Sequence, residues 1–129
     1  MSQIWKYNNV ELELDMGDID TVERYERAFT KMEEAAKKLP KTGVYSEMSR
    51  AYCRMFYELY DDLFGVGTGE KLMGKRYNVR ETEKCYNAFL TFVRSQIREI
   101  DQIRANTLGN RKERRYNQKK GRTGHESVL

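Results

Sequence analysis

Three apolar stripes of helical period constrain the fold of this 129-residue chain more than any other feature. In each stripe the apolar side chains recur at three- and four-residue steps, which places them on one face of an α-helix. The members are Val22, Tyr25, Phe29, Met32 and Ala36; Met48, Tyr52, Met55, Phe56, Leu59, Tyr60 and Leu63; and Cys85, Phe89, Phe92, Val93, Ile97, Ile100 and Ile103. Three such faces can cover one another, so we predict a small, mainly α domain of three helices. The second stripe is the widest, which indicates a central helix.

An alternating pattern at the N-terminus, about residues 4–14, predicts a β-hairpin. Two short runs of β-forming residues flank a pair of asparagines, and asparagine tolerates the positive φ angles of a two-residue type I′ turn. In the second run Val10, Leu12 and Leu14 alternate with glutamates, so one face of the hairpin is apolar. A lone hairpin is only marginally stable in water. We therefore expect this face to lie on the helices or on a partner.

Capping residues suggest where the first two helices begin and end. Asp18 or Asp20 opens the first helix, and Glu23 follows Asp20 at capping-box spacing. Pro40 ends this helix, and Ser46 is the expected cap of the second, which runs to Phe64.

A glycine-rich corner follows the second helix, since four of the nine glycines lie between residues 65 and 74. Gly65 suits the end of the preceding helix because glycine adopts positive φ without steric cost. Thr68 is the expected cap of a short helical turn.

The corner resembles a phosphate-binding P-loop only superficially. Glu70 separates the last glycine from Lys71, and a helix rather than a strand precedes the loop.

The charge is distributed unevenly along the chain. Residues 1–103 contain sixteen Lys or Arg against eighteen Asp or Glu, whereas residues 104–129 contain eight basic residues against two glutamates. The apolar period stops after Ala105, and the stretch 106–110 reads as a helix breaker. We therefore predict a helical domain over residues 1–105 and a flexible basic C-terminal tail over residues 106–129. The basic residues of this tail are Arg111, Lys112, Arg114, Arg115, Lys119, Lys120 and Arg122.

The sequence offers no recognisable catalytic, metal-binding or cofactor-binding motif. Its single histidine, His125, has no cysteine or histidine at metal-ligand spacing. Cys53 and Cys85 each fall inside a helical pattern, so two buried thiols are favoured over a disulfide or a metal pair. We expect no enzyme activity. No apolar run is long enough for a membrane span and no signal peptide precedes the domain, so a cytoplasmic protein is expected.

Four segments, taken in order, carry a family resemblance. They are Val10–Asp15, Asp20–Ala28, Phe56–Gly74 and Ala88–Val93, and a basic stretch follows them. The most specific piece is Asp61-Asp62-Leu63-Phe64-Gly65 followed by Gly67-Thr68-Gly69. Over residues 4–105 the chain resembles small tail assembly chaperones encoded in the tail modules of long-tailed phages and prophages of Gram-positive bacteria.

The resemblance implies a non-enzymatic protein of the bacterial host cytoplasm. Such chaperones coat the long helical tape measure protein and help tail-tube subunits polymerise around it, and a frameshifted longer form exists in some phages. Adaptable side chains such as Met and Tyr suit a binding surface of this kind. Our candidates for partner contact are Trp5, Tyr7, Tyr57, Tyr60, Phe64 and Leu72.

Two other functions remain open at this point. The basic tail, with Tyr116 among its cations, has the composition to neutralise phosphates and stack on a base, which would make the chain a small nucleic-acid-binding protein. The same cations would also suit an acidic protein partner or simply favour solubility. A structural connector that stays in the particle is the third possibility, and self-association is compatible with each of them.

Overall fold

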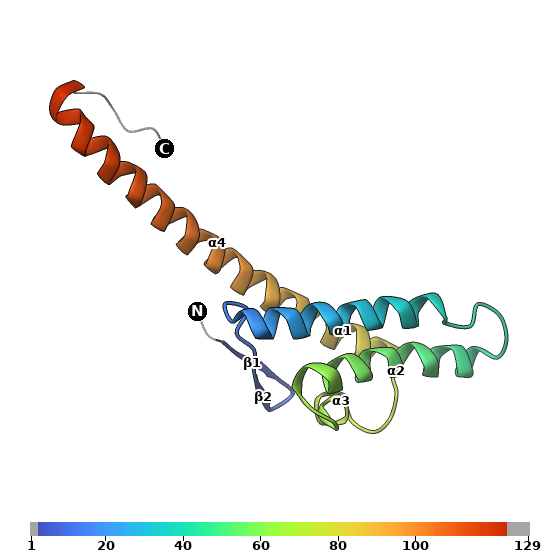
Figure 1. Cartoon of the computed structure of the whole chain (residues 1–129). Helices are drawn as coiled ribbons and strands as arrows, with labels where there is room; N and C mark the ends of the chain where they lie inside the picture. The colour runs from blue at the N-terminus through green and yellow to red at the C-terminus, as the bar shows by residue number, and fades with distance from the viewer. Residues whose placement is uncertain (1–2, 124–129) are drawn as a thin grey trace. The chain divides into compact units, whose positions relative to one another are not determined.

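The computed structural model describes the backbone of residues 3–123 and the side chains of residues 3–109. In chain order the elements are β1 (Ile4–Tyr7), β2 (Val10–Glu13), α1 (Ile19–Lys37), α2 (Tyr45–Phe64), α3 (Thr68–Met73) and α4 (Val79–Thr123). The predicted class, mainly helical with an N-terminal hairpin, is confirmed (Figure 1). The chain divides into two compact units, residues 1–96 and 97–129, which are described separately.

The N-terminal hairpin has the predicted turn. β1 and β2 pair antiparallel with Trp5 opposite Leu12. Asn8 and Asn9 both have positive φ, at 47° and 62°, as a type I′ turn requires. The apolar face of the hairpin packs on the helices of unit 1, where Trp5 is buried.

The N-terminal caps of α1 and α2 differ in part from the predicted ones. Asp18 is the N-cap of α1, and its carboxylate accepts hydrogen bonds from the backbone N–H and the hydroxyl of Thr21. The capping box starting at Asp20 was therefore wrong. The expected cap of α2 at Ser46 was also wrong, because that helix begins at Tyr45 with Val44 as an N-cap that makes no side-chain hydrogen bond.

The last helix is longer than the sequence indicated. α4 begins after Asn78, whose side-chain oxygen accepts a hydrogen bond from the N–H of Glu81 at 3.0 Å. The predicted end at Ala105 was wrong, because α4 continues without interruption through residues 106–110 to Thr123. Asn, Thr and Gly each disfavour a helix by only about 1 kcal/mol or less relative to Ala, which an established helix can absorb.

The core of unit 1 is organised around the fully buried ring of Phe89 on α4. Ring centroids from three other elements lie near it: Trp5 of β1 at 5.2 Å, Tyr60 of α2 at 5.6 Å and Tyr25 of α1 at 6.4 Å. The second helix is central, as predicted, since it packs on both α1 and α3 and buries more side chains than α1 (Figure 1).

A buried glutamine ties α4 to the link between the hairpin and α1. The Gln96 side chain accepts a hydrogen bond from the N–H of Met16 at 2.8 Å and donates one to the carbonyl of Leu14 at 2.7 Å. Gln96 is only 2% exposed, so water does not compete for these two backbone groups. One side chain thus satisfies two buried backbone groups, the N–H of Met16 and the carbonyl of Leu14.

We predict that Gln96→Leu lowers the free energy of unfolding by about 2–4 kcal/mol, because two buried backbone groups lose their partners. Urea denaturation followed by circular dichroism would measure the change. Gln102→Leu, at an exposed position of the same helix, is the matched control and should change stability by less than about 0.5 kcal/mol. Equal losses in the two variants would contradict the role assigned to Gln96.

Candidate interaction surfaces

The glycine-rich corner between α2 and α4 is a hydrogen-bonded structural turn in unit 1. Gly65 and Gly67 have φ angles of 115° and 93°, so the left-handed region is used where the chain reverses. The hydroxyl of Thr68 donates to the carbonyl of Gly65 at 2.7 Å. Thr68 is therefore the first residue of α3 and not its cap, which is Gly67.

Further hydrogen bonds join the corner to its neighbours. The N–H of Gly69 donates to the carboxylate of Asp61 at 2.9 Å, which satisfies a donor at the start of α3. The Asn8 amide of the hairpin turn donates to the Leu72 carbonyl at 2.7 Å, and the Tyr57 hydroxyl donates to the Gly74 carbonyl at the same distance. These contacts fix the corner from both sides.

The acidic pair at the end of α2 has a structural explanation that the sequence did not reveal. Two carboxylates at a helix C-terminus oppose the helix dipole. Asp61 caps the neighbouring helix α3, and Asp62 forms an ion pair with Lys31 of α1 at 3.2 Å. Both carboxylates are therefore used within unit 1.

Gly69 is required because α3 lies directly on α2. A Cβ atom at this position would come within 2.9 Å of both the Cα and the carbonyl oxygen of Tyr57. Backbone atoms cannot move aside as a flexible side chain can, so α3 would have to shift.

Accordingly, Gly69→Ala should lower the free energy of unfolding by about 1–3 kcal/mol through overpacking. Thermal and urea denaturation of the purified variant would test this. Glu70→Ala, at the adjacent exposed position of α3, is the control and should be close to neutral. A Gly69→Ala variant as stable as the parent would show that α3 can move away from α2.

Most of the side chains expected to contact a partner lie inside the core. Trp5, Tyr57, Tyr60 and Leu72 are each 5% exposed or less, whereas Tyr7 and Phe64 are half-buried. The buried four are not available as surface contacts in this folded state, because they fill the space between the hairpin and helices α2, α3 and α4. Of the six candidates, only Tyr7 and Phe64 retain accessible surface.

The two cysteines are free, buried thiols, as the sequence favoured. Cys53 accepts a weak hydrogen bond from the hydroxyl of Thr82 at 3.5 Å. Burial raises the pKa of Cys85 to about 11, and the neighbouring Tyr60 hydroxyl opposes this effect only in part. A thiol with a raised pKa is a poor nucleophile at neutral pH, so Cys85 acts as a small core residue.

The Tyr60 hydroxyl is buried and makes no standard hydrogen bond to any described residue.

Several tyrosines are held in their neutral form by their surroundings. Burial, together with a 2.7 Å hydrogen bond to Glu83, raises the pKa of Tyr52 to about 12. Burial also raises the pKa of Tyr57 to about 12. In the unfolded chain these hydroxyls titrate near pH 10, so between pH 10 and 12 the unfolded state binds fewer protons than the folded state.

We therefore expect the free energy of unfolding to fall as pH rises from about 10 to about 12, with the tyrosine contribution fully present below pH 10. Urea denaturation at a series of pH values would measure the slope. Tyr52→Phe should make the slope shallower, because one titrating group is removed. Stability that stays constant or increases across this range would contradict the assignment.

No group of three or more His, Cys, Asp or Glu side chains within the described part of the chain is placed to hold a metal ion. Among those same residues, no helix has the length and apolarity needed to cross a membrane.

Exposed apolar side chains mark the surfaces that remain without a covering element. In unit 1 they are Ile19, Val44, Tyr45 and Val66, which are 67%, 58%, 76% and 97% exposed. Val44 and Tyr45 are neighbours at the start of α2, whereas Val66 stands alone at the tip of the glycine corner. Single exposed apolar residues are common on soluble proteins and do not by themselves define a site.

Unit 2 carries a longer apolar stripe on α4. Ile97, Ile103 and Leu108 are 39%, 59% and 48% exposed, and Ile100 between them is half-buried. At 100° per residue these four positions fall within less than half of the helix circumference. The stripe continues the face that α4 uses in unit 1, where Phe89 and Val93 are buried. Within the described part of unit 2, nothing covers it.

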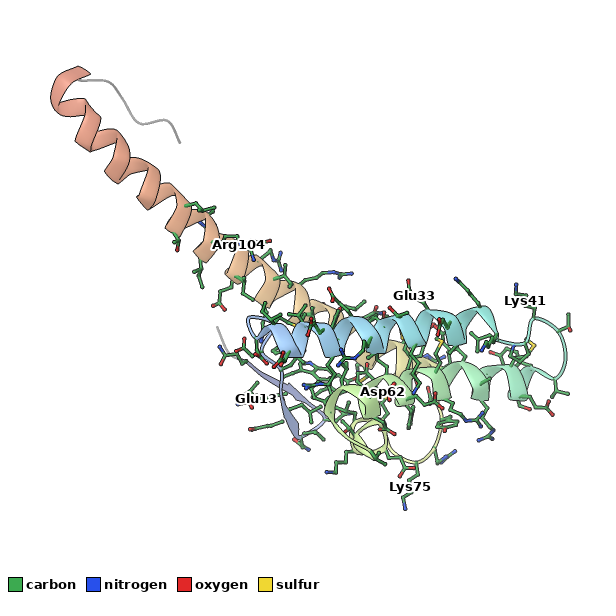
Figure 2. All side chains as sticks on the ribbon, viewed as in Figure 1. Glu13, Glu33, Lys41, Asp62, Lys75 and Arg104 are labelled. Atoms are coloured by element: carbon green, nitrogen blue, oxygen red, sulfur yellow. The ribbon has the colours of Figure 1, made fainter. Side chains whose placement is uncertain are left out.

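The predicted basic side chains, from Arg111 to Arg122, lie beyond the described side chains, although the backbone there is helical to Thr123. Arg104 is the last labelled side chain on α4 in Figure 2 and pairs with Asp101 at 3.3 Å. His125 lies outside the described residues. The sequence identified Ile97, Ile100 and Ile103 as apolar helix positions but assigned them to the core rather than to a surface, and it placed Leu108 in the expected helix breaker.

These features define a small helical protein in which a hairpin and three helices surround an aromatic core and the last helix extends into a second unit. The chain belongs to a protein family of unknown function (DUF6673), whose family model matches residues 8–118. The match therefore includes the hairpin turn, helices α1 to α3 and α4 as far as residue 118. No curated protein and no solved structure matches the chain.

Proposed function

We propose that this protein is a non-enzymatic tail assembly chaperone that binds the tape measure protein of a long-tailed phage or prophage and assists tail-tube assembly. The observation that carries the proposal furthest is the uncovered apolar stripe of α4, formed by Ile97, Ile100, Ile103 and Leu108. The resemblance of residues 4–105 to such chaperones supports the same role. On this proposal the protein acts in the cytoplasm of the bacterial host.

The stripe has the properties that a helix-binding surface requires. An amphipathic helix is recognised through apolar side chains at three- and four-residue spacing, and the stripe offers Ile97, Ile100 and Ile103 at three-residue steps along α4. Aliphatic side chains pack against varied partners, which suits a long helical client whose sequence changes along its length. By helical spacing Arg98 lies beside the stripe and Arg104 falls within it, and such charges favour solubility of the free protein.

Tyr7 and Phe64 can contribute a second, smaller contact in unit 1, since each retains some accessible surface. The four buried candidates would contribute only indirectly, through the stability of the fold. Binding should therefore depend more on α4 than on the aromatic residues that the sequence singled out.

The proposal predicts that Ile97→Asp combined with Ile103→Asp abolishes binding to the tape measure protein without unfolding unit 1. Charges placed in the stripe would have to be buried in the complex without partners, which is strongly unfavourable. Co-expression with the long helical protein encoded nearby, followed by co-purification at moderate salt, would measure binding. Circular dichroism would verify the fold.

Gln102→Asp combined with Asn106→Asp is the matched control, because it adds the same charge on the opposite side of α4. This variant should keep the client soluble and should co-purify with it. Failure of the parent protein to retain the client would overturn the proposal. Equal binding by the parent and the Ile97/Ile103 variant would exclude the stripe as the binding surface.

Nucleic-acid binding through the basic segment is the alternative function, supported by its seven Lys or Arg within residues 111–122. The salt dependence of binding distinguishes the nucleic-acid-binding function from the chaperone function. A complex held by phosphate contacts weakens steeply between low and moderate salt, because bound counterions are released, whereas an apolar protein complex weakens far less. A shift of DNA or RNA at low salt, with no retention of the tape measure protein, would favour the alternative.

A further inference from the structure

The turn between α1 and α2 exposes apolar side chains that the fold does not explain. Val44 and Tyr45 are adjacent in the chain and are 58% and 76% exposed. Val44 is the N-cap of α2 and makes no side-chain hydrogen bond there. Valine is among the least favourable N-cap residues, whereas a serine or an aspartate would satisfy a helix N–H. An exposed apolar residue at a position where a polar one would stabilise the fold indicates a role other than folding.

Three lysines lie in the same turn. Lys37 ends α1, Lys38 is its C-cap, and Lys41 follows four residues after Lys37. All three residues are exposed, and none forms an ion pair with a described carboxylate. Residues 35–46 contain no Asp or Glu, so this stretch has a net charge of +3. We call residues 37–45 the α1–α2 tip.

The carboxylates next to the α1–α2 tip leave its charge unpaired. Glu33 and Glu34 precede the first two tip lysines by one helical turn, but no ion pair joins them. Glu47 lies in the first turn of α2, where it interacts favourably with the helix dipole. The α1–α2 tip is therefore a positively charged surface with two exposed apolar side chains.

The α1–α2 tip stands at one end of unit 1. Figure 1 shows this turn at the end of the α1–α2 pair that lies away from the β-hairpin and α3, and Figure 2 shows Lys41 there. Since α2 has 20 residues, it is about 30 Å long, which separates the tip from the glycine corner by roughly that distance. A large flat surface can therefore contact the tip without meeting the hairpin or α3.

These properties fit the surface of a membrane that contains anionic lipids. Lysine lays its apolar stem along an apolar phase while its charged end reaches the lipid headgroups. Tyrosine is enriched where apolar and aqueous phases meet. An acidic protein would also attract the lysines, but it would need a pocket shaped for a protruding turn to cover Val44 and Tyr45. A bilayer needs no such pocket.

We propose that the α1–α2 tip binds the surface of an anionic lipid bilayer. Val44 and Tyr45 enter the headgroup region, and the tip lysines contact lipid phosphates. Two apolar side chains and three lysines form a smaller contact than stable anchoring requires, so the binding is weak and reversible. This inference does not depend on the proposed chaperone function, because it involves neither the α4 stripe nor the tape measure protein.

The test is co-sedimentation of the full-length protein with vesicles that contain phosphatidylglycerol and phosphatidylcholine in equal amounts. Vesicles of phosphatidylcholine alone are the comparison. We expect the protein to bind the anionic vesicles and to bind the neutral ones at least roughly tenfold more weakly, because each lysine near an anionic surface strengthens binding roughly fivefold.

Val44→Ser separates lipid binding from folding. Serine can cap α2, so this variant should have a higher urea midpoint than the parent. It should nevertheless bind the anionic vesicles about tenfold more weakly, because two methyl groups no longer enter the bilayer. A residue with only a structural role would not change stability and binding in opposite directions. Val66→Ser, which changes the 97% exposed valine of the glycine corner, is the matched control and should bind like the parent.

A pair of lysine variants tests the charge. Lys38→Gln combined with Lys41→Gln should weaken binding to the anionic vesicles about twenty-five-fold, since two contacts of about fivefold each are lost. Lys71→Gln combined with Lys75→Gln removes the same charge from exposed positions beyond the other end of α2 and should bind like the parent. The basic segment 111–122 is the same in all these variants, so its own attraction to lipid does not cause a difference between them.

A fluorescent reporter identifies the part of the chain that enters the bilayer. In Tyr45→Trp, the new indole should shift its emission to shorter wavelength when anionic vesicles are added, because it leaves water. The native Trp5 is 5% exposed in the core and contributes a constant background. Val66→Trp is the control and should show no shift.

Four results would overturn the proposal. They are a parent protein that does not bind anionic vesicles, equal binding to the neutral vesicles, a Tyr45→Trp variant that binds without an emission shift, and tip variants that bind like the parent. The last two would mean that the basic segment binds the lipid. If the parent instead binds polyglutamate, and Lys38→Gln with Lys41→Gln removes that binding, the tip recognises an acidic protein and not a membrane.

Discussion

The ring of Phe89 holds unit 1 together, because side chains from the hairpin, α1 and α2 all meet it. Trp5, Tyr25 and Tyr60 approach this one residue of α4 from three different elements. A chain of this size has only one modest core, so a change at Phe89 affects the packing of β1, α1, α2 and α4 together. The hairpin contributes to that core through Trp5 and, with Gln96 securing the loop behind it, is an integral part of the fold.

The periodic apolar pattern of the sequence predicted most of this fold. The errors lie at helix ends, where several neighbouring residues can serve as a cap or a stop. The hairpin, its asparagine turn, the three main helices and the glycine corner all follow from short-range patterns in the sequence. The caps at Asp20 and Ser46 were misplaced because several polar residues near each helix start can serve as a cap, and only packing selects among them. The end of α4 was misjudged because weak helix formers stop a helix only when no established helix continues into them.

The candidate interaction surfaces were less predictable than the fold. Large aromatic residues are equally suited to a core and to an interface, and the sequence does not distinguish the two uses for Trp5, Tyr57 and Tyr60. Conversely, Ile97 and Ile103 were expected to be buried because their stripe continues that of Phe89 without a break. Which part of a long apolar stripe is covered depends on where the other helices end, and that is a property of the tertiary structure.

The continuity of α4 has a consequence for how the second unit acquires its structure. An isolated helix must first form a nucleus, which is disfavoured by a factor on the order of 10⁻³. Residues 97–123 avoid this step, because the folded turns up to Gln96 already supply hydrogen-bonding groups from which the helix can propagate residue by residue. Folding of unit 1 therefore favours helicity in the basic segment, because it supplies the nucleus from which the rest of α4 propagates.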